Sequence, residues 1–230
     1  MATYVLVHGA GSDSWYWHLV TAELVGRGHD VVAPDLPVAD ESAGLAEYTE
    51  AVVRVIGDRE DLIVVAQSMA GFTAPLVCER VPVTLLVLLA AMVPAPGESP
   101  GQWWGATGHE QARRELDERE GRDPDAPFDP EVTFLHDVPQ DVREQLFARG
   151  GGVQADRPFA DPWPLAEWPD VPTRFLLCQD DRFFPSGFQR RIAEERLGIT
   201  ADEMPGGHLP ALARPLDLVE RLEEYRRGRG

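Results

Sequence analysis

The sequence of 230 residues contains no lysine and no asparagine, and it has only two cysteines, Cys78 and Cys178. Without lysine, covalent catalysis through a lysine Schiff base is impossible. Two cysteines are too few for a zinc cluster, and each stands inside an apolar stretch, so we expect two buried free thiols and no disulfide framework. We therefore expect a protein that needs no metal and no cofactor.

Basic residues are also scarce, because 21 arginines stand against 39 acidic residues and give a formal net charge of −18. Such a surface repels phosphate backbones and anionic lipids, so neither a nucleic acid nor a membrane is an expected partner. The longest apolar run, around 85–93, is shorter than the roughly 20 residues that span a bilayer. The N-terminus lacks the basic segment and cleavage site of a signal peptide. We expect a cytoplasmic monomer or homodimer that acts on a small molecule.

Short apolar runs rich in β-branched residues alternate with helical patterns along most of the chain. This alternation is typical of βαβ units and predicts an α/β protein with a doubly wound, mostly parallel sheet of about six strands. The expected strands are 4–7, 30–33, 62–66, 83–91, 174–178 and 201–204. The expected helices are 15–27, 45–56, 69–80, 186–197 and 216–227.

The alternation stops in residues 94–171, where prolines, glycines, charges and scattered aromatic residues replace the strand-like runs. We expect this stretch to be a helical cap inserted into a core formed by 1–93 and 172–230. The cap should lie over the carboxyl ends of the strands, where open α/β sheets bind ligands. Helices are predicted within it at 111–120 and 140–149, and the glycine run at 150–152 predicts a flexible loop.

The most informative segment is Val-Val-Ala-Gln-Ser-Met-Ala-Gly, in which an apolar strand runs through Ser68 into a helical pattern. Ala66 and Ala70 stand two residues before and two residues after the serine. A nucleophile elbow needs small residues there, because its very tight strand-to-helix turn holds the serine hydroxyl clear of the backbone. Glycine is commoner than alanine at both positions. We nevertheless interpret Ser68 as a nucleophile and not as an ordinary helix N-cap.

A serine becomes nucleophilic only with a base in hydrogen-bond reach and a carboxylate that orients the base. His208 stands in a glycine-rich loop before the last predicted helix, and Asp180 and Asp181 follow the strand that ends at Cys178. Either aspartate could orient the histidine. The order serine, aspartate, histidine along the chain is one that serine hydrolases use.

Backbone amides are expected to complete the site, because the transition state of acyl transfer places negative charge on the carbonyl oxygen. One amide is that of Met69, the residue after the nucleophile. The other is expected in the glycine-rich loop His-Gly-Ala-Gly-Ser, which follows the first strand and ends at Ser12.

The chain resembles α/β-hydrolase fold proteins of the compact group that includes plant methylesterases, hydroxynitrile lyases and many bacterial esterases. The resemblance covers nearly the whole chain and rests on the segments VHGAGSDSWYWHLV, GHDVVAPDLP, VVAQSMAG, DDRFFP and GGHLPAL. It implies that Ala10, which follows His-Gly, supplies the second oxyanion amide, and that His8 supports this loop. It also implies that Asp181, four residues before the proline, is the triad acid and Asp180 a structural neighbour.

Two departures from related enzymes favour acyl chemistry. Hydroxynitrile lyases of this group carry a lysine directly after the catalytic histidine, whereas here Leu209 follows His208. Epoxide hydrolases and dehalogenases of this fold place an aspartate at the elbow, where this chain has Ser68. Both differences favour hydrolysis of an acyl group over cyanohydrin cleavage or attack on an alkyl carbon.

The expected substrate pocket includes Gly9, Ser12, Trp104 and Leu209. Aromatic residues are concentrated in the cap to an extent unusual for a polar segment, although packing of the cap would account for most of them. They are Trp103, Trp104, Phe128, Phe134, Phe147, Phe159, Trp163 and Trp168.

Together these features predict a carboxylesterase-like serine hydrolase that cleaves a small apolar or aromatic ester, or a lactone, through an acyl-enzyme. Because a neutral imidazole is the base, kcat/KM should fall below about pH 6 to 7. Two alternatives stay open. The same triad serves carbon–carbon bond hydrolases and lyases, and a slow-turnover member of the fold could bind a hydrophobic ligand. The natural substrate is not fixed by the sequence.

Overall fold

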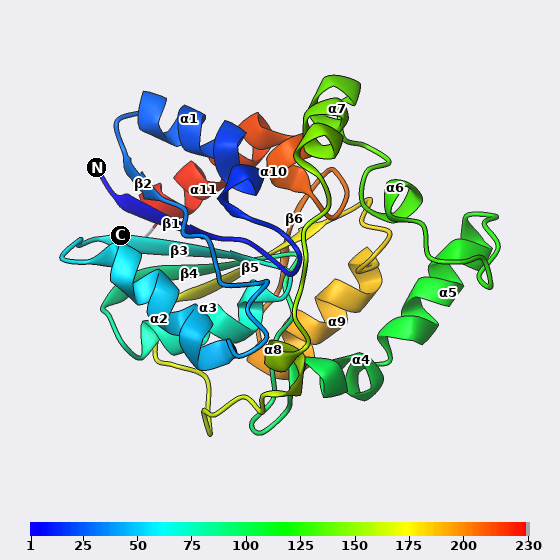
Figure 1. Cartoon of the computed structure of the whole chain (residues 1–230), viewed down its shortest axis with the longest axis horizontal. Helices are drawn as coiled ribbons and strands as arrows, with labels where there is room; N and C mark the ends of the chain where they lie inside the picture. Colours follow the sequence, from blue (N-terminus) through cyan, green and yellow to red (C-terminus); the bar gives the residue numbers. More distant parts are fainter. Residues whose placement is uncertain (229–230) are drawn as a thin grey trace.

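The computed structural model describes residues 1–228 and has a six-stranded sheet at its centre (Figure 1). The strand order is β2-β1-β3-β4-β5-β6, and every neighbouring pair is parallel. The expected fold class is therefore confirmed. The strands are β1 (Thr3–Val7), β2 (Asp30–Val32), β3 (Leu62–Gln67), β4 (Val83–Leu89), β5 (Thr173–Cys178) and β6 (Asp202–Met204).

Both faces of the sheet are covered by helices. Neighbouring residues of a strand face opposite sides, so Val64 packs with α2, α3 and α9, whereas Val65 packs with α1, α10 and α11. Burial on both sides explains why the central strands are apolar along nearly their whole length. These helices are α1 (His18–Gly26), α2 (Leu45–Ile56), α3 (Ala70–Cys78), α9 (Ser186–Leu197), α10 (Pro210–Ala213) and α11 (Pro215–Arg227).

The segment between β4 and β5 is helical and lies beside the carboxyl ends of the strands (Figure 1). In this view α5 and α6 stand to the right of the sheet and α7 lies close to α10. The chain then returns across the front of the molecule to α8. The helices of this segment are α4 (Pro100–Thr107), α5 (His109–Arg119), α6 (Pro130–Thr133), α7 (Gln140–Arg149) and α8 (Arg157–Ala160).

Several element bounds differ from those expected. The strand expected at 83–91 ends at Leu89, because Ala90 adopts a left-handed φ of 42° that stops the ladder. The helix expected at 15–27 begins with the 3₁₀ turn Ser14–Trp17 before α1. Helix α4 was missed, although a Ser-Pro-Gly-Gln capping box marks its start, in which Ser99 Oγ accepts a hydrogen bond from Gln102 N at 3.2 Å.

The two cysteines differ in burial. Cys178 lies buried in β5, as expected, whereas Cys78 at the end of α3 is only partly buried, so the expectation of two buried thiols was wrong for Cys78. Neither forms a disulfide. Within residues 1–228, no helix combines the length and the apolar character needed to cross a membrane.

Candidate active site

Ser68 occupies the turn between β3 and α3. Its φ is 54°, a left-handed conformation that costs free energy for any residue except glycine and that is typical of a nucleophile elbow. Two hydrogen bonds hold the turn against the end of β4: Ser68 N donates to Leu89 O at 3.2 Å, and Met92 N donates to Ser68 O at 3.0 Å. A Cβ on Gly71 would lie 1.9 Å from Met92 O, so this position has room only for glycine.

The structure brings Ser68, His208 and Asp181 into one chain of hydrogen bonds. His208 Nε2 lies 3.1 Å from Ser68 Oγ, and His208 Nδ1 lies 2.8 Å from Asp181 Oδ2. Their exposed fractions are 9% for Ser68, 3% for His208 and 1% for Asp181. Because Nδ1 faces a carboxylate it carries the ring hydrogen, which leaves the lone pair of Nε2 toward the hydroxyl. In this geometry His208 Nε2 can accept the proton of the Ser68 hydroxyl.

Backbone amides fix the carboxylate of Asp181. Its Oδ1 accepts hydrogen bonds from Phe183 N and Phe184 N, both at 2.8 Å, and Gln189 Nε2 lies 3.3 Å from Oδ2. Asp180, the other candidate, points elsewhere: its Oδ2 accepts a hydrogen bond from Gly206 N at 2.9 Å. Asp180 therefore holds the loop that carries the histidine, whereas the carboxylate bonded to the imidazole is that of Asp181.

The loop of His208 is held from two further sides. Gln67, the residue before the serine, donates from Nε2 to His208 O at 3.1 Å. From the cap, Asp137 Oδ2 accepts a hydrogen bond from Gly207 N at 2.7 Å. The histidine is thus tied both to the elbow and to the segment between β4 and β5.

The loop after β1 lies against the elbow. A Cβ on Gly9 would meet Gln67 Oε1 at 2.5 Å and Ser68 Cβ at 2.9 Å, so only glycine allows the two loops to approach this closely. His8 fastens the loop, because its Nδ1 lies 2.8 Å from Gly9 O and its Nε2 accepts from Leu36 N at 3.1 Å. Burial lowers the pKa of His8, which keeps the ring neutral at pH 7.

Two amides remain available beside Ser68. Over residues 1–228, neither Ala10 N nor Met69 N donates a hydrogen bond to another group of the protein. Ala10 and Met69 both line the cavity that contains Ser68 and His208. Free N–H groups next to a reactive serine can accept the negative charge of a tetrahedral intermediate.

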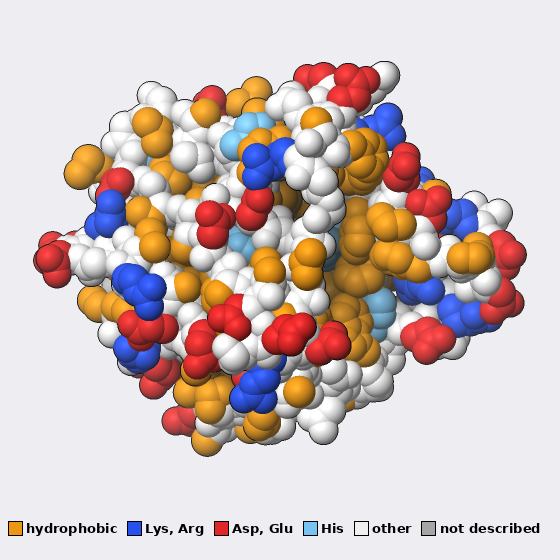
Figure 2. Space-filling model, in the orientation of Figure 1, with side chains coloured by type: hydrophobic (Ala, Val, Ile, Leu, Met, Phe, Trp, Pro, Cys, Tyr) orange, Lys and Arg blue, Asp and Glu red, His pale blue; other side chains and the backbone are white. Residues whose placement is uncertain are grey.

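This cavity has a volume of about 750 Å³ and is mostly apolar. Figure 2 shows it as a hollow lined with hydrophobic side chains, between the returning chain and the cap helices on the right. Of the expected pocket residues, Ser12, Trp104 and Leu209 line it. Gly9 does not, which corrects the expectation, because it is packed behind Gln67 and Ser68.

The aromatic residues of the cap fall into two sets. Trp104, Phe134, Phe147 and Phe159 line the cavity. The others serve packing or lie outside: Trp103 and Trp163 are buried in the core, Trp168 packs against it, and Phe128 is half exposed.

Three side chains near the site were not among the predicted site residues. Phe183 lines the cavity, and its ring centroid lies 5.1 Å from that of His208. His109 of α5 packs edge-on against Phe183 and lies 2.7 Å through Nε2 from Phe183 O, while burial lowers the pKa of His109 to about 4. Gln189 of α9 donates to Phe184 O at 2.6 Å as well as to Asp181. Of these three, only His109 reaches the loop of Asp181 from a distant part of the chain, and no local motif marks that contact.

In the part of the chain that the structure describes, no three histidine, cysteine or acidic side chains lie close enough together to hold a metal ion.

The fold and this geometry agree with comparisons to known proteins. A model of the α/β hydrolase family matches residues 4–222, so the chain belongs to that family. Methyl jasmonate esterase 1 of Vitis vinifera is 25% identical, with 96% of this chain and 95% of the relative covered. Norfluorocurarine synthase 1 of a Strychnos species is also 25% identical, covering 96% and 94%.

Among solved structures, an extracellular α/β-hydrolase from a Paenibacillus species superposes with a TM-score of 0.77 at 21% identity, covering 97% of this chain and 98% of that one. This likeness concerns the fold. Family membership and the esterases among the relatives make the chain an esterase-like α/β hydrolase.

Proposed function

We propose that this protein is a serine carboxylesterase that uses Ser68, His208 and Asp181 as its catalytic triad. The observation that supports this most strongly is the hydrogen-bonded chain from Ser68 Oγ through His208 to Asp181, beside the unused amides of Ala10 and Met69. A serine, its base, the orienting acid and the oxyanion donors are the complete set that acyl transfer requires.

The reaction proceeds in two halves. Ser68 Oγ attacks the carbonyl carbon while His208 Nε2 takes the hydroxyl proton, and the amides of Ala10 and Met69 stabilise the resulting oxyanion. When the carbon–oxygen bond of the leaving group breaks, His208 returns the proton to the alkoxide, leaving an acyl group on Ser68. Water then attacks this ester with its proton passing to Nε2, and the carboxylic acid leaves as the proton returns to Ser68.

The cavity indicates the class of substrate. Its walls are aromatic and aliphatic, and they include Trp104, Phe134, Phe159 and Phe183. Burial of apolar surface in such a pocket supplies the binding free energy, at roughly 25 cal/mol per Å². We infer a small, neutral ester or lactone with an apolar or aromatic group. Methyl jasmonate esterase, a relative, is named for such an ester.

The proposal is tested with a panel of p-nitrophenyl esters of increasing acyl length. Ser68→Ala is expected to lower kcat by at least about 10⁴-fold, because the nucleophile and its covalent intermediate are lost. Ser42→Ala, a serine on an exposed turn, is the matched control and should leave kcat and KM unchanged. Comparable turnover by Ser68→Ala would contradict the proposal.

Two other functions are separate outcomes of the same test. Cleavage of a β-diketone without cleavage of any ester would indicate a carbon–carbon bond hydrolase or lyase. Tight binding of a hydrophobic molecule with turnover slower than about one per hour would indicate a ligand-binding member of the family. The cytoplasmic location and the monomeric or dimeric state stay predictions.

A further inference from the structure

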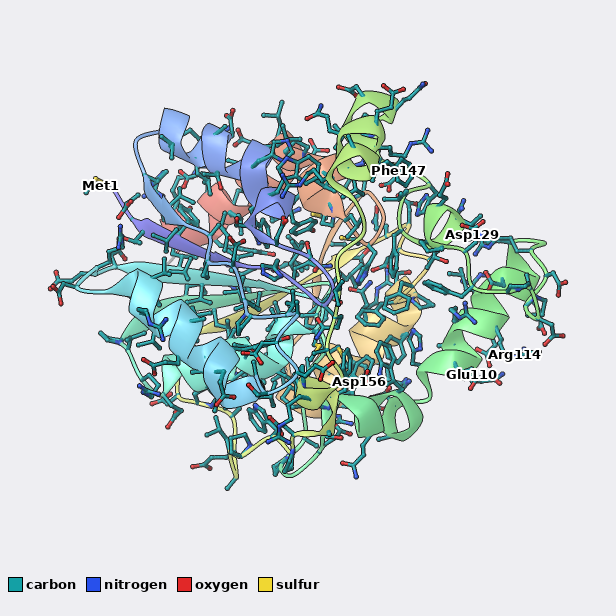
Figure 3. The ribbon with its side chains drawn as sticks, in the orientation of Figure 1. Met1, Glu110, Arg114, Asp129, Phe147 and Asp156 are labelled. Carbon is teal, nitrogen blue, oxygen red and sulfur yellow. The ribbon has the colours of Figure 1, made fainter. Side chains whose placement is uncertain are left out.

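We propose that Gln154, in the chain between α7 and α8, positions the oxyanion hole and thereby makes the cap part of the catalytic apparatus. We call residues 150–155 the strap. In Figure 3 the strap runs from α7, labelled at Phe147, down to α8, labelled at Asp156, across the front of the molecule. This inference rests on the proposed function, because it concerns the Ala10 amide of the same site.

The amide of Gln154 bridges the oxyanion loop and the core. Its Oε1 accepts a hydrogen bond from Gly11 N at 2.9 Å, and Gly11 directly follows Ala10. Its Nε2 lies 3.1 Å from Tyr48 Oη on α2 and 2.9 Å from Ala155 O. With both ends of its amide bonded, Gln154 has one orientation, and this orientation fixes the peptide that joins Ala10 to Gly11.

Gly152 packs closely against the next peptide of the loop, which joins Gly11 to Ser12. A Cβ on Gly152 would lie 1.9 Å from Gly11 O, so the strap passes directly over the carbonyl of the oxyanion loop. Gly11 itself has a φ of 63°, a conformation that glycine adopts without strain. Within the glycine run that predicted a flexible loop, Gly152 therefore lies in close contact with the oxyanion loop.

Both ends of the strap are fixed to the core. At its end, Ala155 N donates to Val38 O at 2.7 Å. Just before its start, Arg149 Nη2 pairs with Asp13 Oδ2 at 2.6 Å, and the guanidinium lies 5.1 Å from the centroid of the Trp15 ring. Asp13 and Trp15 continue the oxyanion loop, so the strap follows this loop along its length.

Fixing this loop should affect the transition state more than the bound substrate. Oxyanion donors act by being held in place before charge develops, and a looser donor loses part of that stabilisation. The neutral substrate carbonyl gains little from the same amides. Loss of the Gln154 hydrogen bond should therefore lower kcat and leave KM nearly unchanged.

The test compares Gln154→Met with the wild-type enzyme on a p-nitrophenyl ester. Methionine has a similar length but cannot accept from Gly11 N. We expect kcat to fall about tenfold while KM changes less than threefold. A trifluoromethyl ketone analogue of the ester, which forms the oxyanion on Ser68, should bind about tenfold more weakly. Enzyme concentration is taken from the final stoichiometry of fluorophosphonate labelling, so a loss of folded protein does not imitate the effect.

Two glycines of the cap provide a second comparison. Gly152→Ala should lower kcat at least as much as Gln154→Met, because its Cβ would collide with Gly11 O. Gly105→Ala in α4 is the matched control, since a Cβ there meets no heavy atom within 4 Å and Gly105 does not line the cavity, and its kcat should stay within twofold of wild type.

The outcomes separate this inference from the function on which it rests. If wild-type protein cleaves esters through Ser68 and Gln154→Met has an unchanged kcat and inhibitor affinity, the positioning role is wrong while the esterase stands. A rise in KM alone would also contradict it and make Gln154 a wall of the pocket. If wild-type protein cleaves no ester, both the proposed function and this inference are wrong.

Discussion

The sheet core and the cap place side chains at the site in different ways. In the core, the central strands are buried on both faces, and Ser68 and Asp181 follow the ends of strands β3 and β5. In the cap, segments between helices contribute single side chains to loops of the core, as Asp137 does to Gly207 and Gln154 does to Gly11. The core thus carries Ser68, Asp181 and His208, and the cap forms hydrogen bonds to the loops beside them.

The two adjacent aspartates provide the sharpest comparison within the core. Asp181→Asn should lower kcat about 10³- to 10⁴-fold, because an amide cannot orient the His208 tautomer that accepts the serine proton. Asp180→Asn is the matched control and should lower kcat less than about tenfold, since the Asp180 carboxylate accepts from Gly206 N, whereas that of Asp181 bonds to His208 Nδ1. The measurement is steady-state kinetics on a p-nitrophenyl ester. An equal loss in both variants would contradict the assignment of Asp181.

Truncation of apolar side chains should separate the core from the cap in stability. Leu88→Ala in β4, a fully buried position, should lower the free energy of unfolding by about 2–5 kcal/mol. Phe147→Ala in α7, a half-exposed residue that lines the cavity, should leave Tm almost unchanged and raise KM for apolar esters several-fold. Urea denaturation and ester kinetics measure the two effects. A loss of stability in Phe147→Ala as large as that in Leu88→Ala would contradict the expected difference between core and cap.

His109, which links α5 to the loop that carries Asp181, should make the free energy of unfolding depend on pH. Burial lowers the pKa of His109 to about 4, whereas an unfolded histidine has a pKa of 6.5, so the unfolded chain binds the extra proton between these values. Its contribution to stability is complete above pH 6.5 and is lost as pH falls toward 4. Between pH 7.5 and pH 5, the free energy of unfolding should fall by about 2 kcal/mol more in the wild-type protein than in His109→Gln. Urea denaturation at each pH measures this difference. Equal losses in the two proteins would contradict this role.

An ion pair at the base of the cap should have the smallest effect. Glu98 binds Arg196 of α9 through two hydrogen bonds of 2.7 and 3.0 Å, and both side chains are mostly buried. Glu98→Gln should lower the free energy of unfolding by about 1–2 kcal/mol. Asp125→Asn, which breaks the exposed pair with Arg114 at the tip of the cap, should leave Tm unchanged. A larger shift for Asp125→Asn would reverse the expected order.

The sequence predicted the core well because its signals are local. Helices α2 and α9 have the bounds expected for them, and the small residues around Ser68 marked the elbow before any contact was known. His208 was predicted from its glycine-rich loop and its place in the chain order, whereas the choice of Asp181 followed from a resemblance to a family, since nothing local distinguishes Asp181 from Asp180.

The cap was predicted only in part: α7 has the expected bounds and α5 nearly so, whereas the contacts of the cap with the core were not predicted. Residues 150–152 were expected to form a flexible loop, since glycine has no side chain to signal packing, yet Gly152 lies against Gly11. Gly9 was expected in the pocket, whereas its lack of a Cβ serves the approach of two loops behind the serine. A sequence shows which residues are small, and only the structure shows what they are close to.

The most direct test of the account is covalent labelling with a fluorophosphonate probe, followed by mass spectrometry of the modified peptide. The account predicts one adduct per chain, on Ser68, with loss of ester turnover in parallel and no labelling of Ser68→Ala. An adduct on another residue that abolishes turnover, or folded protein that cleaves esters while Ser68 stays unmodified, would contradict the claim that Ser68 is the nucleophile.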